Sequence, residues 1–183
     1  MEEKKSLWAF GTREVVYAAI GAALYGVFSW ITNFIGLPAA GNITLRPAVA
    51  IPMFFGVAFG PIVGFISGFL GNVIGDFLSG FGFWWYWDLG NGLMGLIPGL
   101  MALGIKSYKD TNTIIKAEIL VVVGAAVGML VSSLLEIPLG GIDLRTAVVG
   151  YWFPSALSDA INGLVLVPIL MVAYDAVVSR SGR

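Results

Sequence analysis

The chain has 183 residues and a formal net charge of −1; 58% of its residues are hydrophobic and 11% are charged. A soluble domain carries about 25% charged residues, so this composition excludes an ordinary soluble globular protein. The sequence contains no His and no Cys, which excludes imidazole or thiolate metal sites, Ser-His and Cys-His catalysis and disulfides. There is no basic stripe, so we expect no nucleic acid partner. We also expect no metal and no cofactor.

The apolar segments predict an all-α integral membrane protein, a single domain over residues 1–183 with six transmembrane helices. Residues 15–45 and 47–75 contain no Asp, Glu, Lys or Arg, and one spanning helix needs about 20 apolar residues. In chain order, we expect helices at approximately 12–34, 47–59, 61–79, 88–105, 113–135 and 145–178.

Local signals set these bounds. Thr12 suits an N-cap, and Pro47 suits a first helical position. Gly60-Pro61 breaks the apolar run between the second and third helices. The segments between the predicted helices include two Gly/Pro-rich loops, suited to act as lids, and one aromatic loop. They cover residues 35–46, 136–143 and 80–87, respectively.

Positive charges decide between six spans and five, the number expected if residues 47–75 formed one tilted helix. With six spans, eight Lys and Arg residues share the side of both termini: Lys4, Lys5, Arg13, Lys106, Lys109, Lys116, Arg180 and Arg183. Only Arg46 and Arg145 lie on the other side. Because cytoplasmic segments carry the excess of Lys and Arg, we predict six spans with both termini in the cytoplasm.

Small residues recur at every fourth position in three predicted helices. The series in the third and fifth helices end in polar residues, whereas the series in the fourth helix begins with Asn91 and continues with Gly95 and Gly99. In the third helix, Gly60, Gly64 and Gly68 precede Asn72 and Asp76. This spacing keeps a series on one helix face, and small residues let helices pack closely. We interpret the glycines as packing seams in the cytoplasmic half, below an outward-facing opening. Its expected lining is Asn72, Asp76, Asp88, Asn91 and Glu136. Any one of them could equally cap a helix; as a group they favour a site.

Asp159 and Asn162 lie three residues apart near the middle of the sixth helix. A carboxylate at this depth is costly unless it faces protein, water or a partner charge, so we expect both residues to contact a ligand. Arg46 and Arg145 begin helices, where a cation opposes the macrodipole. Each either holds an anionic ligand group or fastens a lid loop through an acidic partner. The candidate partners are Asp143, Glu136 and Asp76.

Aromatic residues occupy six of the seven positions from Phe81 to Trp87. Such rings stack on flat ligands, and they also anchor helix ends at the lipid interface. For this segment alone, the interfacial interpretation is favoured. Because the polar cluster lies at the same membrane face, we include Trp84 and Trp85 among the candidate ligand contacts.

Small residues also follow one face of the first helix, where Ala18, Ala22 and Gly26 precede Ser29 and Asn33. Two interpretations remain open. This face packs on a neighbouring span of the same chain, or its residues Ala18, Ala22 and Gly26 dock on another membrane protein.

Four segments carry a resemblance to a known family: Ala18-x-x-x-Ala22, Leu45-Arg46-Pro47-Ala48-Val49-Ala50-Ile51-Pro52, Phe59-Gly60-Pro61-Ile62-Val63-Gly64 and Asp159-Ala160-Ile161-Asn162-Gly163. With them, the chain resembles the substrate-binding (S) component of an energy-coupling factor (ECF) transporter, of the riboflavin-type group. The resemblance covers most of the chain and extends to its size and six-span layout.

The resemblance implies a small prokaryotic plasma-membrane protein that binds a water-soluble vitamin or related micronutrient at the outer face, under loops that follow helices 1, 3 and 5. It also implies docking of helix 1 on a transmembrane coupling (T) subunit and energy from two cytoplasmic ATPases. This chain has no Walker A motif, so it is not expected to be an enzyme itself. The group label and the aromatic segment point towards riboflavin; the acids and arginines would equally suit another donor-rich ligand.

Two other classes compete with this interpretation. A self-contained homodimeric small-molecule transporter or channel needs a polar path across the membrane, but the cytoplasmic halves are made of glycine and aliphatic residues. An intramembrane protease needs His or paired Asp signatures. There is no His, and Gly75-Asp76 and Tyr174-Asp175 only faintly resemble the latter.

Overall fold

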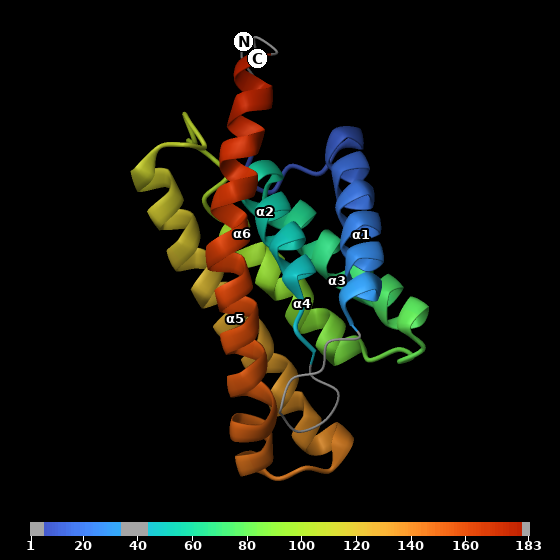
Figure 1. Cartoon of the computed structure of the whole chain (residues 1–183). Helices are drawn as coiled ribbons and strands as arrows, with labels where there is room; N and C mark the ends of the chain where they lie inside the picture. Colours follow the sequence, from blue (N-terminus) through green and yellow to red (C-terminus); the bar gives the residue numbers. More distant parts are fainter. Residues whose placement is uncertain (1–5, 34–43, 181–183) are drawn as a thin grey trace.

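The computed structural model describes residues 6–33 and 44–180, and these residues fold into an all-helical bundle (Figure 1). The elements in chain order are α1 (Thr12–Thr32), the 3-10 helix η1 (Pro47–Val49), α2 (Ala50–Phe59), α3 (Pro61–Ser79), α4 (Trp85–Gly99), α5 (Thr111–Gly140), the π-helix η2 (Thr146–Trp152) and α6 (Phe153–Arg180). The expected all-α architecture with six main helices is therefore present. Phe34 and most of the predicted lid loop at 35–46 lie outside the described residues.

The break between the second and third helices lies where the sequence places it. Gly60 has φ 108° and ψ 166°, a backbone conformation that favours glycine, and Pro61 occupies the first turn of α3. Residues 47–75 therefore do not form a single helix.

Three helix bounds differ from the predicted ones by more than two residues, and two of these changes fall in the expected loops. α4 begins at Trp85 instead of Asp88, so Trp85 and Trp87 are helical residues, and it ends at Gly99 instead of Ile105. α5 continues through Pro138 to Gly140. The segment from Glu136 to Gly140 is therefore helix, not lid loop. A proline in the last turn removes one backbone hydrogen bond close to the helix end, where carbonyls already lack intrahelical partners.

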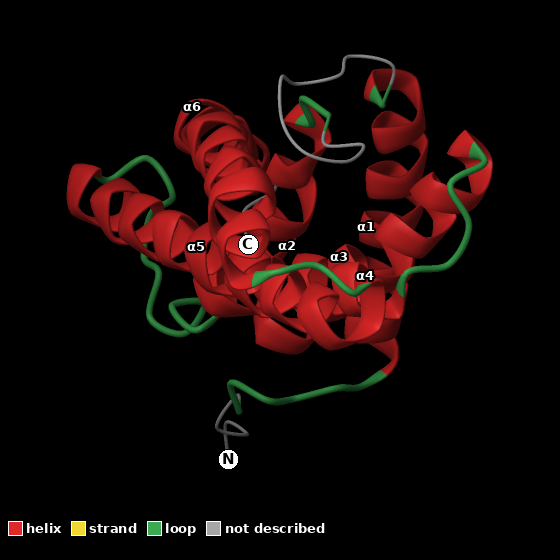
Figure 2. Cartoon of the chain, turned by 90° about the horizontal axis from the view of Figure 1, so that it is seen from below, coloured by secondary structure: helices red, strands yellow, loops and turns green. Residues whose placement is uncertain are grey.

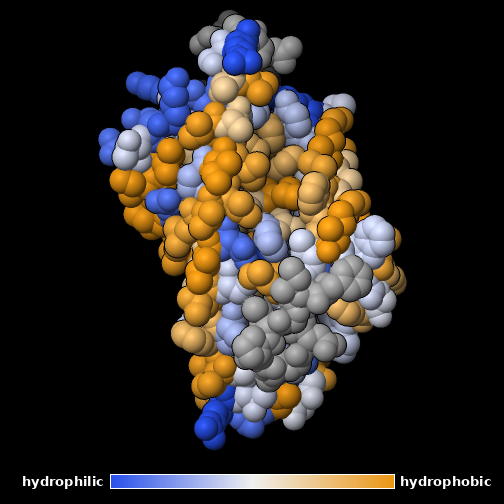
Figure 3. Space-filling model, viewed as in Figure 1, coloured by the Kyte–Doolittle hydropathy of each residue, from blue (hydrophilic) through white to orange (hydrophobic). Residues whose placement is uncertain are grey.

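Four helical segments are long and apolar enough to cross a membrane: α1, α3, α5 and the continuous run Thr146–Arg180. Residues Pro47–Phe59 and α4 are shorter. α2 lies among α1, α3, α4 and α6 (Figure 2). Most of its side chains are buried. Many large apolar side chains on the longer helices are exposed, and they colour most of the face in Figure 3 between hydrophilic groups at its two ends. The chain is thus a multi-pass membrane protein.

Glycines bring the backbones of α3 and α4 into direct contact. A Cβ atom added to Gly95 would lie 2.2 Å from the carbonyl oxygen of Gly64, and one added to Gly68 would lie 2.1 Å from that of Asn91. No side chain fits at such distances, so these positions are packing seams, as predicted. On the other side of α4, Gly128 of α5 approaches the carbonyl oxygen of Gly90 in the same way.

The small-residue face of α1 packs inside the chain, against α3. Ala18 and Ala22 are 2% and 3% exposed, and Gly26 is buried. A Cβ on Gly26 would lie 2.6 Å from the Ile74 side chain, and Ser67 donates a hydrogen bond to the Ala18 carbonyl at 3.5 Å. The intramolecular interpretation therefore holds. The alternative prediction, that Ala18, Ala22 and Gly26 dock on another membrane protein, is wrong because α3 covers these residues.

Candidate functional site

A cavity of about 400 Å³ opens at the end of the bundle opposite the start of α1 and the end of α6. Its size lies within the range of small-molecule sites. The lining comes from the helices other than α2 and from the segments next to them: Asn33, Thr44, Arg46, Asn72, Asp76, Gly80, Phe81, Trp84, Trp87, Glu136, Tyr151, Ser155 and Asp159. One wall is thus aromatic, and three carboxyl side chains share the cavity with one guanidinium.

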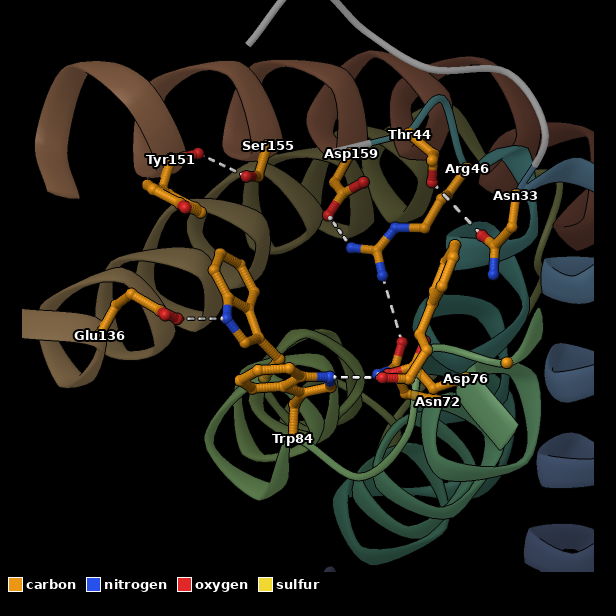
Figure 4. A pocket seen from close by; sticks show the side chains of 13 residues that line it. Asn33, Thr44, Arg46, Asn72, Asp76, Trp84, Glu136, Tyr151, Ser155 and Asp159 are labelled. Carbon is orange, nitrogen blue, oxygen red and sulfur yellow. Dashed lines mark hydrogen bonds and ion pairs between the residues drawn. The ribbon is translucent and has the colours of Figure 1, made fainter. Parts of the chain in front are cut away.

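Arg46 joins three elements at one side of the cavity (Figure 4). It immediately precedes η1, its Nη2 lies 3.2 Å from Asp159 Oδ2 on α6, and its Nη1 donates to Asn72 Oδ1 on α3 at 3.1 Å. The Asp159 side chain is 1% exposed. A buried carboxylate requires such a partner, which explains why α6 tolerates an aspartate at this depth.

Asn72 links the cavity to a buried polar network below it. Its Nδ2 donates to Asp76 Oδ2 and to Asp88 Oδ1, each at 2.9 Å. The Tyr25 hydroxyl donates to Asn91 Oδ1 at 2.6 Å, with Asn72 Oδ1 at 3.3 Å. These hydrogen bonds connect α1, α3 and α4, so the polar floor helps to hold the three helices together.

The aromatic wall is held by hydrogen bonds from its indole groups. Trp87 Nε1 donates to Glu136 Oε2 at 2.8 Å, which fixes the position of this buried carboxylate on α5. The Trp87 ring lies 6.0 Å from that of Tyr151, centroid to centroid. Trp84 Nε1 donates to the Phe81 carbonyl at 2.8 Å, although Trp84 is half-exposed at the rim.

The chain segments at the rim are tied to helix ends. Asn33 Nδ2 donates to Ser79 Oγ at 2.9 Å, and Thr44 Oγ1 donates to Asn33 Oδ1 at 3.3 Å. On the far side, Asp143 accepts bonds from the backbone N–H and the hydroxyl of Thr146. These bonds to the charged form hold the pKa of the Asp143 carboxyl below its usual range. Asp143 therefore caps η2 and does not pair with Arg46.

The predicted ligand contacts fall into three groups. Five line the cavity: Arg46, Asn72, Asp76, Trp84 and Asp159. Asp88 and Asn91 are fully buried in the polar floor. Trp85, Asn162 and Arg145 do not line the cavity.

The structure explains why Asn162, Arg145 and Trp85 lie away from the cavity. Asn162 is turned about 60° around the helix axis from Asp159, and it donates to the carbonyl of Ser158 on its own helix at 3.0 Å. Arg145 is exposed one residue before η2. Trp85 is 44% exposed at the start of α4, as expected of an interfacial anchor.

Sequence reasoning missed several residues of the cavity and of its polar floor. Tyr151, Ser155 and Asp159 recur at intervals of four, and all three line the cavity. Tyr25 follows Ala18 and Ala22 at helical spacing on the buried face of α1. Trp87 was assigned to a loop, which concealed that it faces Glu136 from the first turn of α4.

A sequence model described as ECF-type riboflavin transporter, S component, matches residues 9–176. The chain belongs to this family. The match includes Arg46, Asp159 and every other residue that lines the cavity.

Curated relatives are similar over shorter stretches. A UPF0397 protein of Vibrio atlanticus is 41% identical over 98 residues, 54% of this chain and 53% of that protein. A UPF0397 protein of Aliivibrio salmonicida is 38% identical over 129 residues, 68% of this chain and 69% of that protein. One of Vibrio vulnificus is 49% identical over 88 residues, 48% of this chain and 47% of that protein. The chain thus spans about half the length of the first of these, and their printed name states no ligand.

Proposed function

We propose that this chain is the high-affinity substrate-binding subunit of an ATP-driven ECF transporter for a water-soluble vitamin or related micronutrient. The observation that carries the proposal is the cavity itself, which combines an aromatic wall with fixed polar groups at one end of a membrane bundle. Concave sites with a few oriented polar groups are typical of small-molecule binding. Riboflavin is the first ligand to test, because the matching family is described by it.

Apolar packing below the cavity favours a binding subunit over a self-contained channel. The core between the polar floor and the opposite end is mainly apolar, and it includes six aliphatic and methionine side chains with 0–1% exposure: Met53, Val57, Val63, Met94, Val121 and Met171. A conducting path needs polar or water-lined walls. The glycine contacts between α3 and α4 close the same region further.

The described charges support the proposed orientation. Arg13, Lys106, Lys109, Lys116 and Arg180 belong to the end with the start of α1, the α4–α5 loop and the end of α6. Arg46 and Arg145 belong to the cavity end. By the positive-inside rule, the cavity then faces outward and both termini lie in the cytoplasm. Lys4, Lys5 and Arg183 lie outside the described residues.

A T subunit and two cytoplasmic ATPases are the proposed partners. Since α3 covers the face with Ala18 and Ala22, we assign docking on the T subunit to the opposite face of α1. That face is exposed and combines small with large apolar residues: Val16, Ala19, Ile20, Ala23 and Val27. Alanines allow close approach of a partner helix.

Mass spectrometry of small molecules that co-purify with the chain tests the proposal. A vitamin-sized molecule should be present in near-stoichiometric amount and should raise the melting temperature when added back. Saturating ligand at a hundredfold excess over Kd stabilises a protein by about 2.7 kcal/mol. A folded chain that neither retains nor is stabilised by any small molecule would contradict the proposal.

A further inference from the structure

The charges that line the cavity are unequal, and this inequality restricts what can bind. Among the described residues, Asp76, Glu136 and Asp159 line it together with a single cation, Arg46. The guanidinium of Arg46 already has partners in the protein, because its Nη2 donates to Asp159 and its Nη1 donates to Asn72. The charges of Arg46 and Asp159 therefore cancel, which leaves Asp76 and Glu136.

Neither of these two acids forms a direct ion pair among the residues that the structure describes, although Asp76 interacts electrostatically with Arg46 over a longer distance. Asp76 accepts from the Asn72 amide, and Glu136 accepts from the Trp87 indole. Both donors are uncharged. Glu136 is only 8% exposed, so little solvent remains to balance its charge.

The positions of the two acids point to an organic ligand instead of a metal ion. Figure 4 shows Glu136 and Asp76 on opposite sides of the open space, with Trp84 below it. No group of three or more acidic side chains able to hold a metal ion occurs in the described residues. A ligand that reaches both acids must therefore span the cavity and lie along its aromatic wall.

We propose that the cavity selects flat heteroaromatic molecules that carry hydrogen-bond donors or positive charge at both ends, and that it excludes their phosphorylated or carboxylated forms. The inference rests on the proposed function and names the ligand class of the same site. Trp84, Trp87 and Tyr151 supply ring faces for stacking and for cation–π contact. Asp76 and Glu136 accept donors at the two ends and repel anions.

Two matched ligand pairs test this selection on the purified full chain: riboflavin with its 5′-phosphate, and thiamine with its monophosphate. Affinity is measured by tryptophan fluorescence and by thermal melting. For each pair whose parent binds, the unphosphorylated member should bind at least about tenfold tighter, since two unpaired carboxylates face the added anion across a poorly hydrated space.

Glu136→Gln and Asp76→Asn each remove one charge and retain the side-chain shape. Each should reduce the discrimination within a pair by about tenfold. Glu118→Gln is the matched control, because Glu118 lies on the same face of α5, five helical turns or roughly 27 Å from Glu136. The control should leave discrimination unchanged.

Equal binding of a parent molecule and its phosphate, or discrimination that survives both neutral variants, would overturn the charge selection while leaving the binding function in place. If neither riboflavin nor thiamine binds at millimolar concentration, the assigned ligand class is wrong. A co-purified molecule of other chemistry would then still support the proposed function. If no molecule co-purifies with the folded chain and none of the added molecules binds to it, the proposed function itself is contradicted.

Discussion

Arg46 and Asp159 are 113 positions apart in the sequence, yet their side chains meet at 3.2 Å at the edge of the cavity. The contact fastens the chain that enters η1 to the middle of the last helix. It also explains two features that look unfavourable separately: an arginine at a helix start and a carboxylate within an apolar helix. Each supplies the counter-charge that the other needs.

A double-mutant cycle measures this coupling. Arg46→Met and Asp159→Leu should each destabilise the protein by about 3 to 5 kcal/mol, because each leaves a buried charge unpaired. The double variant should be less destabilised than the sum, with a coupling of about 0.5 to 3 kcal/mol. The measurement is thermal unfolding of the purified variants. Additive effects would show that the pair carries no interaction.

The two neighbouring tryptophans Trp87 and Trp85 should differ sharply in importance. Trp87→Phe removes the indole N–H that donates a hydrogen bond to Glu136, and it leaves this buried carboxylate without its donor. Ligand affinity should fall roughly tenfold to a hundredfold, as expected for a loss of about 1 to 3 kcal/mol. Trp85→Phe at the exposed start of α4 serves as the control and should bind like the wild type. Affinity is measured by ligand titration. An equal loss of affinity in both variants would contradict the assignment of Trp87, and not Trp85, to the aromatic wall.

Removal of the Tyr25 hydroxyl should weaken the polar floor. Tyr25 is fully buried, and Tyr25→Phe leaves Asn91 Oδ1 without its 2.6 Å donor, at a cost of about 1 to 3 kcal/mol in stability. Tyr17→Phe is the control on the same helix, where the hydroxyl accepts only a 3.4 Å bond from Arg13 in an exposed position. The melting temperature should fall for Tyr25→Phe and stay close to the wild-type value for Tyr17→Phe. A similar melt for both would argue against the network.

The two faces of α1 should respond oppositely to a large side chain. Ala22→Trp overpacks the contact with α3, so the isolated chain should melt earlier, at a cost of typically 1 to 3 kcal/mol or more. Ala19→Trp lies on the exposed face and should leave melting and ligand binding of the isolated chain unchanged.

When co-expressed with the T subunit and the ATPases, Ala19→Trp should fail to assemble and to support uptake. Co-purification and cellular uptake provide the measurements. Wild-type assembly with Trp at both Ala19 and Ala23 would show that this face is not the docking surface.

Local sequence signals predicted most of the fold. The Gly60-Pro61 break and the glycine seams rest on steric rules that act within a few residues or along one helix face, and the structure has both. The bounds of α4 and α5 depended on tertiary contacts. Trp87 and Glu136 bond across two helices, and this contact belongs to helix ends that were predicted as loops because of their aromatic, Gly and Pro content.

The site was predictable in composition but not in pairing. Asn72, Asp76 and Asp159 were recognisable because polar groups are rare within apolar helices. The Arg46–Asp159 pair was missed, because only the three-dimensional arrangement brings residues of η1 and α6 together. Asn162 was included with Asp159 by proximity in sequence, whereas the four-residue spacing of Tyr151, Ser155 and Asp159 identifies the lining face.

The most direct test of the central claim reconstitutes the purified chain alone in liposomes and follows both binding and flux of its co-purified ligand. The account predicts saturable binding of one ligand molecule per chain, with no movement of ligand across the membrane until the T subunit and the ATPases are added with ATP. Ligand flux through the chain alone, or no binding by a folded chain, would contradict the account.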